Sequence, residues 1–193
     1  MQSADDLDRA VDSVVAALSP GTGRDWQAPA GSLEWPCRFT AEHAAHCLHT
    51  YAMQLASRTP AHYVSFFSRA LKVSTNAQVL ELLEASGRLL SAVVRAAKPT
   101  DRGFHPFGSA DAEGTAGMGC IELLVHGSDI AAGLGLPFEP PPDVSAWILA
   151  IASLRVAVRG RTSSTPVIET TRSTMGAVPS CRTALRPRSF AAA

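Results

Sequence analysis

The sequence has little aromatic content, no net charge and no long apolar run. Aromatic residues make up 6% of the 193 residues, and 17 basic side chains balance 17 acidic ones. A neutral chain offers no general electrostatic attraction to nucleic acid or to an anionic membrane surface. No apolar run reaches the roughly 18 to 20 residues that span a bilayer. We therefore expect a cytoplasmic protein that binds neither nucleic acid nor a membrane.

The chain also lacks paired cysteines. Its four cysteines are irregularly spaced and form no CxxC motif, which argues against a disulfide framework and in favour of a reducing compartment. The N-terminal segment is acidic where a signal peptide would be basic. We expect three of the cysteines to be small core residues: Cys37, Cys47 and Cys120.

The residues that are abundant, alanine, leucine and valine, favour helices over sheets. Apolar side chains recur at helical spacing in five segments, with Thr40 expected to cap the second. The segments are 5–18, 40–59, 76–98, 113–132 and 144–158. Residues 62–73 are ambiguous between strand and helix, and we interpret them as an extended or irregular crossover. The pattern predicts an all-α bundle of four or five helices with one crossover connection.

The composition changes near the end of the chain. From Arg155 onward there are seven arginines and one acidic residue, Glu169, and the apolar periodicity disappears. We predict a helical domain over 1–158 and a poorly ordered, flexible tail over 159–193.

A carboxylate and an imidazole share one face of the fourth predicted helix. Glu122 and His126 are four residues apart, which places them about 40° apart around the axis and about 6 Å along it. Asp129 falls on the same stripe, and the surrounding residues are apolar. Burial of both groups costs several kcal/mol unless each is satisfied, and a divalent cation would satisfy both. The alternatives are a simple Glu–His hydrogen bond or an exposed helix face, and the spacing alone favours these because such pairs are common by chance.

The second predicted helix carries three histidines. His43 lies near its start, beside the loop that contains Trp35, and forms an i, i+4 pair with Cys47. His46 and His49 follow at intervals of three, so all three histidines cannot face one point equally well. We therefore choose His43 as the candidate ligand and assign His46 and His49 to the surface or its boundary.

Taken together, the motifs resemble a known family, the N-terminal metal-binding domain of mycothiol-dependent maleylpyruvate isomerases in the DinB-like superfamily. The similarity covers about residues 5–150 and rests on the order and separation of three motifs. These are Trp35-x7-His43, the run from His105 to Gly119, and Glu122-x3-His126 followed by Gly127-Ser128-Asp129-Ile130-Ala131 and Gly133-Leu134-Gly135. The family domain usually continues into a structured C-terminal part, from which this sequence departs.

The resemblance implies a DinB-like four-helix bundle with a divalent metal, usually zinc, held by His43, Glu122 and His126. It also implies a thiol cofactor, mycothiol, which characterised members bind and activate at the metal. We expect an isomerase or S-transferase whose partners are a small-molecule thiol and a small organic substrate, acting as a monomer or homodimer. The alternatives are a metal-binding regulatory or partner-binding bundle without catalysis, and a plain helical scaffold. Asp129 would either orient His126 or cap its own helix.

Overall fold

The computed structural model describes residues 2–106 and 108–160, with side-chain surroundings up to residue 151. This part contains five α-helices, a short 3-10 helix (Ser19–Gly21) and no strand, so the predicted all-α class is confirmed. The helices are α1 (Gln2–Leu18), α2 (Cys37–Ser57), α3 (Asn76–Ala96), α4 (Ala112–Gly133) and α5 (Pro142–Gly160). The predicted tail over 159–193 and Cys181 lie outside the described residues, except for the last two residues of α5.

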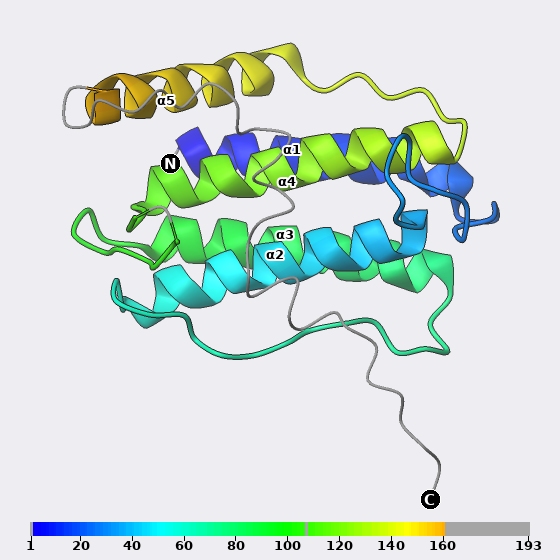
Figure 1. The fold of residues 1–193 in the computed structure, drawn as a ribbon, viewed down its shortest axis with the longest axis horizontal. Coiled ribbons are helices and arrows are strands. Elements are labelled where there is room, and N and C mark those ends of the chain that lie inside the picture. The colour runs from blue at the N-terminus through cyan, green and yellow to red at the C-terminus, as the bar shows by residue number, and fades with distance from the viewer. Residues whose placement is uncertain (1, 107, 161–193) are drawn as a thin grey trace, which may run out of the picture. The chain divides into compact units, whose positions relative to one another are not determined.

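Helices α1 to α4 lie side by side and form a four-helix bundle (Figure 1). Helix α2 packs against α3 and α4, and α1 packs against the same two helices from the other side, so α1 and α2 are diagonal. Helices α2 and α3 run in the same direction, which requires a connection as long as the bundle (Figure 1). The compact unit ends at Ile151.

The core of the bundle is built from leucine, valine and alanine, as the composition predicts. Its largest fully buried aliphatic side chains come from all four helices: Leu7, Leu18, Leu48, Leu55, Leu83, Leu90, Leu123 and Ile130. Cys37, Cys47 and Cys120 are buried, in agreement with their prediction as core residues. No helix in the described part of the chain is long and apolar enough to cross a membrane.

Helix α2 begins three residues earlier than predicted, and Thr40 is not its cap. The loop before the helix supplies the acceptors instead: the backbone N–H groups of Cys37 and Arg38 donate to the carbonyls of Ala28 and Trp26, each at 2.9 Å. These bonds satisfy amides that a helix start otherwise leaves unpaired. The Thr40 hydroxyl donates back to the Pro36 carbonyl at 3.0 Å, inside the helix. His43 consequently lies in the second turn of α2.

The crossover between α2 and α3 has no regular structure over 58–75, as predicted for 62–73. Several residues of the crossover contact side chains of α2. Arg69 pairs with Glu42 at 2.5 Å, and the ring of Phe67 packs against His46 at a centroid distance of 5.0 Å. The Ser68 hydroxyl lies 3.3 Å from His46 Nδ1 and 3.2 Å from His49 Nδ1.

The packing of the crossover against His46 shows that the assignment of this residue to the surface is wrong. His46 is only 8% exposed, because the crossover covers the side of α2 that carries it. His49 is half-buried, which agrees with a boundary position. Helical periodicity could not reveal the burial of His46 because the covering segment is itself irregular.

Candidate metal centre

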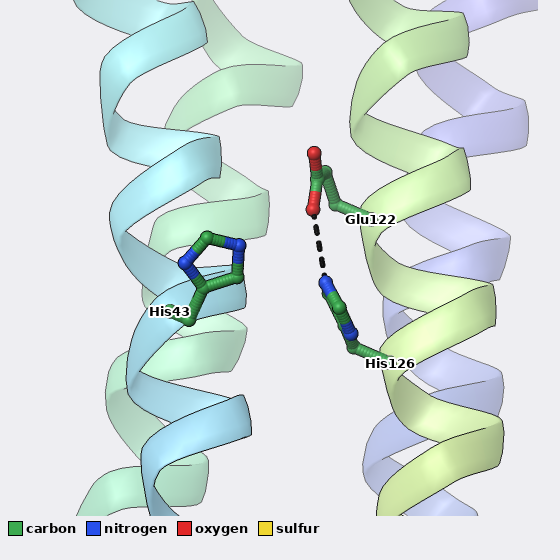
Figure 2. A group of neighbouring side chains, drawn as sticks. All are labelled: His43, Glu122 and His126. Atoms are coloured by element: carbon green, nitrogen blue, oxygen red, sulfur yellow. Dashed lines mark ion pairs between the residues drawn. The ribbon is translucent and has the colours of Figure 1, made fainter. Parts of the chain in front are cut away.

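The three residues predicted as ligands converge between α2 and α4. His43 projects from α2 toward Glu122 and His126, which project from successive turns of α4 (Figure 2). One donor atom from each lies within 4.8 Å of the other two. Among the described residues these are the only three histidine, cysteine, aspartate or glutamate side chains that meet in this way.

The three side chains are largely buried, and four of their polar atoms lack hydrogen-bond partners. His43 is 7% exposed and His126 is 5% exposed, and the Glu122 side chain is 13% exposed. Within the described residues, His43 Nδ1, both ring nitrogens of His126 and Glu122 Oε2 make no hydrogen bond. His126 Nε2 and Glu122 Oε2 are 3.3 Å apart but poorly aligned for one. Buried polar groups are rarely left unpaired, so this cluster requires an explanation.

The spacing of the pair on α4 suits a tetrahedral ion. A nitrogen at about 2.05 Å and an oxygen at about 2.1 Å from one tetrahedral zinc ion lie about 3.4 Å apart. The observed separation between His126 Nε2 and Glu122 Oε2 is 3.3 Å. The residues present therefore fit a divalent metal ion without rearrangement of this pair.

His43 is held by its neighbours in an uncharged state. The indole of Trp35 meets its ring edge-on at a centroid distance of 5.1 Å, and Cys47 Sγ lies 3.5 Å from its Nε2. Burial lowers the pKa of His43 to about 4, despite the opposing effect of the nearby Glu122 carboxylate. A neutral imidazole is the form that binds a metal.

His126 is in the opposite electrostatic situation. Burial by itself would lower its pKa, but the carboxylates of Asp129 and Glu122 raise the pKa of His126 to about 9. In return, although burial opposes it, the ion pair with His126 keeps the pKa of Glu122 below its usual value. Without a metal the pair is therefore a protonated imidazole beside a carboxylate.

Asp129 lies behind His126 rather than at the end of the helix. Its Oδ2 is 3.7 Å from His126 Nδ1, on the side of the ring away from Glu122. Helix α4 ends four residues later, at Gly133, and its C-cap is Leu134. Of the two roles left open by the sequence, the geometry favours orientation of His126, a common role for a carboxylate behind a metal-binding histidine.

Tyr51 also lies in the site, although no sequence pattern marked it as a functional residue. Its hydroxyl donates to Glu122 Oε1 at 2.8 Å. Tyr51 stands two turns after His43 on α2, four residues beyond Cys47, and fits the apolar stripe of that helix. The spacing of eight residues from His43 was the available signal, but it specifies no partner on α4.

The pKa values predict the pH dependence of metal binding. His126 is protonated at pH 7 in the metal-free protein, so binding should release about one proton per ion. Affinity should rise about tenfold per pH unit from pH 5 to 9, then level off above the pKa of His126. Titration calorimetry in buffers of different ionisation enthalpy measures the protons released. A release near zero at pH 7 would contradict the ion-pair state of His126.

Searches for similar proteins returned no matching family model, no matching curated protein and no matching solved structure. The resemblance to the maleylpyruvate isomerase family therefore rests on the sequence motifs alone.

Proposed function

We propose that this protein binds a divalent metal ion, with zinc as the expected ion, through His43, Glu122 and His126. We further propose that it uses this centre in a thiol-dependent reaction, either isomerisation of a conjugated organic substrate or addition of the intact thiol to that substrate, with the thiol proton going to the substrate carbon. The thiol expected from the motif resemblance is mycothiol, and the organic substrate is small.

The observation that carries the proposal is the set of buried donor atoms without partners. Leaving a buried donor or acceptor unsatisfied costs about 1–3 kcal/mol, and more for a charged group. The cluster contains such atoms on all three side chains. A cation coordinated between α2 and α4 would compensate Glu122 Oε2 and His126 Nε2 together, which lie 3.3 Å apart without a hydrogen bond. The Glu122–His126 ion pair leaves His43, which projects toward the same point, outside this compensation (Figure 2).

The chemistry of the donors supports zinc with one coordination position left open. Two imidazole nitrogens and one carboxylate oxygen are ligands that zinc accepts, and three protein ligands with one open position are typical of catalytic rather than structural zinc sites. When bound, such an ion would lower the pKa of a coordinated thiol and favour the nucleophilic thiolate.

The surroundings of the three ligands contribute charge and orientation. Glu122 supplies the only negative charge among the three ligands, so a divalent ion and its ligands would keep one positive charge, which the Asp129 carboxylate beside His126 would offset. Trp35 packs against His43, and Asp129 stands behind His126, so each imidazole is held in place from outside the centre. Fixed ligands of this kind keep a site preorganised.

Cobalt loading followed by a thiol titration tests this proposal. Cobalt(II) takes the same ligands as zinc, and a coordinated thiolate produces a strong near-ultraviolet charge-transfer band. The loaded protein should lack this band and gain it in proportion to added mycothiol or a close analogue. If the protein takes up one cobalt ion and no band appears at saturating thiol, the thiol-dependent function is rejected while the metal site stands.

One observation favours a second candidate, a metal-binding bundle without catalysis. Cys47 Sγ is 3.5 Å from His43 Nε2, close to the separation of about 3.5 Å expected for sulfur and nitrogen on one tetrahedral zinc ion. Cys47 is outside the group whose donor atoms all lie within 4.8 Å, so its sulfur would have to move toward α4 to close the site. In that case the charge-transfer band appears without added thiol and is lost in Cys47→Ser.

A further inference from the structure

The two oxygens of Glu122 have different surroundings. Oε1 accepts a hydrogen bond of 2.8 Å from the Tyr51 hydroxyl. Oε2 lies 3.3 Å from His126 Nε2 and has no hydrogen-bond partner among the described residues. One oxygen of the carboxylate therefore accepts a hydrogen bond from the protein, and the other faces the histidines (Figure 2).

We propose that Tyr51 is a positioning residue that makes Glu122 a one-oxygen ligand, with Oε1 held by Tyr51 and Oε2 offered to the metal. This inference rests on the metal site proposed above and adds to it the residue that sets the geometry of the carboxylate. A free carboxylate can rotate and offer either oxygen or both, so a fixed donor on Oε1 restricts the choice.

The fold explains why the donor comes from α2. Tyr51 stands on the same helix as His43, while Glu122 stands on α4, so the hydrogen bond joins the two helices that supply the ligands. It also fixes the carboxylate relative to His43 and not only relative to its helical neighbour His126. A short bond from a neutral donor to a buried carboxylate is among the stronger hydrogen bonds in proteins.

Substitution of the two tyrosines tests the inference, because the chain contains only Tyr51 and Tyr63. Tyr51→Phe removes the hydroxyl and keeps the ring. Loss of a partner that orients a ligand lowers metal affinity by about 10–100-fold, and we expect Tyr51→Phe to bind zinc that much more weakly in a competition assay with a chelator. Tyr63→Phe is the matched control, since that ring packs edge-on against Phe104 at 4.8 Å, and it should bind zinc as the wild type does.

The visible spectrum of the cobalt-loaded protein separates positioning from general destabilisation. Release of Oε1 changes the coordination geometry, so the ligand-field bands of Tyr51→Phe should shift, whereas those of Tyr63→Phe should not. A residue that merely supported the fold would lower the melting temperature and leave these bands in place. In a Glu122→Ala background, Tyr51→Phe should have no further effect on affinity, because its partner is gone.

The wild-type protein gives an independent readout if Tyr51→Phe does not fold. On zinc binding, the infrared antisymmetric and symmetric carboxylate stretches should move apart, as they do for one-oxygen coordination. A narrowed separation, typical of two-oxygen coordination, would overturn the inference. Equal affinity and equal spectra for Tyr51→Phe and wild type would overturn it while leaving the metal site intact. Absence of metal from the wild type would remove the proposed function and the inference together.

Discussion

Replacement of His126 by alanine is expected to strip the metal from the protein and leave the bundle folded. The variant loses one of three protein donors, and an effect on affinity larger than the roughly 100-fold loss typical of residues that only orient a ligand is expected. The Glu122 carboxylate also loses the neighbouring protonated imidazole of His126, which keeps the pKa of Glu122 below its usual value. His43→Ala should behave in the same way, because it removes the only ligand contributed by α2.

The other two histidines of α2 provide matched controls for this result. His46 and His49 both lie within hydrogen-bond distance of the Ser68 hydroxyl on the crossover, and neither belongs to the metal-binding group. Their alanine variants should retain one metal ion per chain, and His46→Ala should be less stable because it leaves a cavity under Phe67.

The measurement is metal content by elemental analysis for the four variants after identical purification, with circular dichroism to establish that each remains helical. The opposite pattern, in which His46→Ala or His49→Ala loses the metal and His126→Ala keeps it, would refute the site. The ligands would then have to be sought on α2 alone.

Replacement of Gly133 by alanine is expected to destabilise the protein severely. A Cβ at this position would lie 2.2 Å from the carbonyl oxygen of Pro29, 2.7 Å from Cys37 Sγ and 2.9 Å from the Ala30 Cα. Two of these neighbours are backbone atoms, which cannot move aside by a change of rotamer. Overpacking costs about 1–3 kcal/mol and occasionally more, and we expect the upper end, about 3 kcal/mol.

The consequence should reach the metal centre. The loop that Gly133 touches leads into α2 through hydrogen bonds of Ala30 with Trp35 and of Ala28 with Cys37. A shift of this loop would move Trp35 from the edge of His43. We therefore expect weaker zinc binding as well as a lower free energy of unfolding in Gly133→Ala, measured by chelator competition and urea titration.

Gly23→Ala is the control for this prediction, since a Cβ there would meet nothing within 4 Å. Gly23→Ala should leave the free energy of unfolding and the free energy of zinc binding unchanged within about 0.5 kcal/mol, as is usual for surface substitutions. Equal free energies of unfolding for the two variants would contradict the prediction. They would show that the loop containing Pro29 and Ala30 can move away from an alanine at position 133 without loss of stability.

The site was predictable from sequence to the extent that its spacing is local. Glu122 and His126 share a face because four residues complete slightly more than one turn, and this holds wherever the helix packs. The choice of His43 over His46 and His49 depended instead on Trp35 and on the motif resemblance. The structure places Trp35 against His43, which the sequence order suggested but could not establish.

The parts that sequence could not predict depend on segments that are distant along the chain. Thr40 has the residue type of a helix cap, yet α2 begins at Cys37 because the carbonyls of Trp26 and Ala28 accept its first amides. Tyr51 has the apolar character of its stripe, yet its hydroxyl meets a carboxylate 71 residues later. Propensity and periodicity describe each helix alone and carry no information on which residues face each other.

The sequence by itself therefore determined the helical class, the approximate extent of the helices and the common face of Glu122 and His126, and it indicated the irregular crossover. These properties follow from backbone propensity, breaker residues and helical pitch, which act over a few residues. The tertiary structure alone decided the burial of His46, the partner of Tyr51 and the uncharged state of His43, and it placed His43 beside α4, where the motif resemblance had only implied it. Each of these depends on which helices pack together, because burial, donor convergence and pKa are set by atoms that come from other parts of the chain.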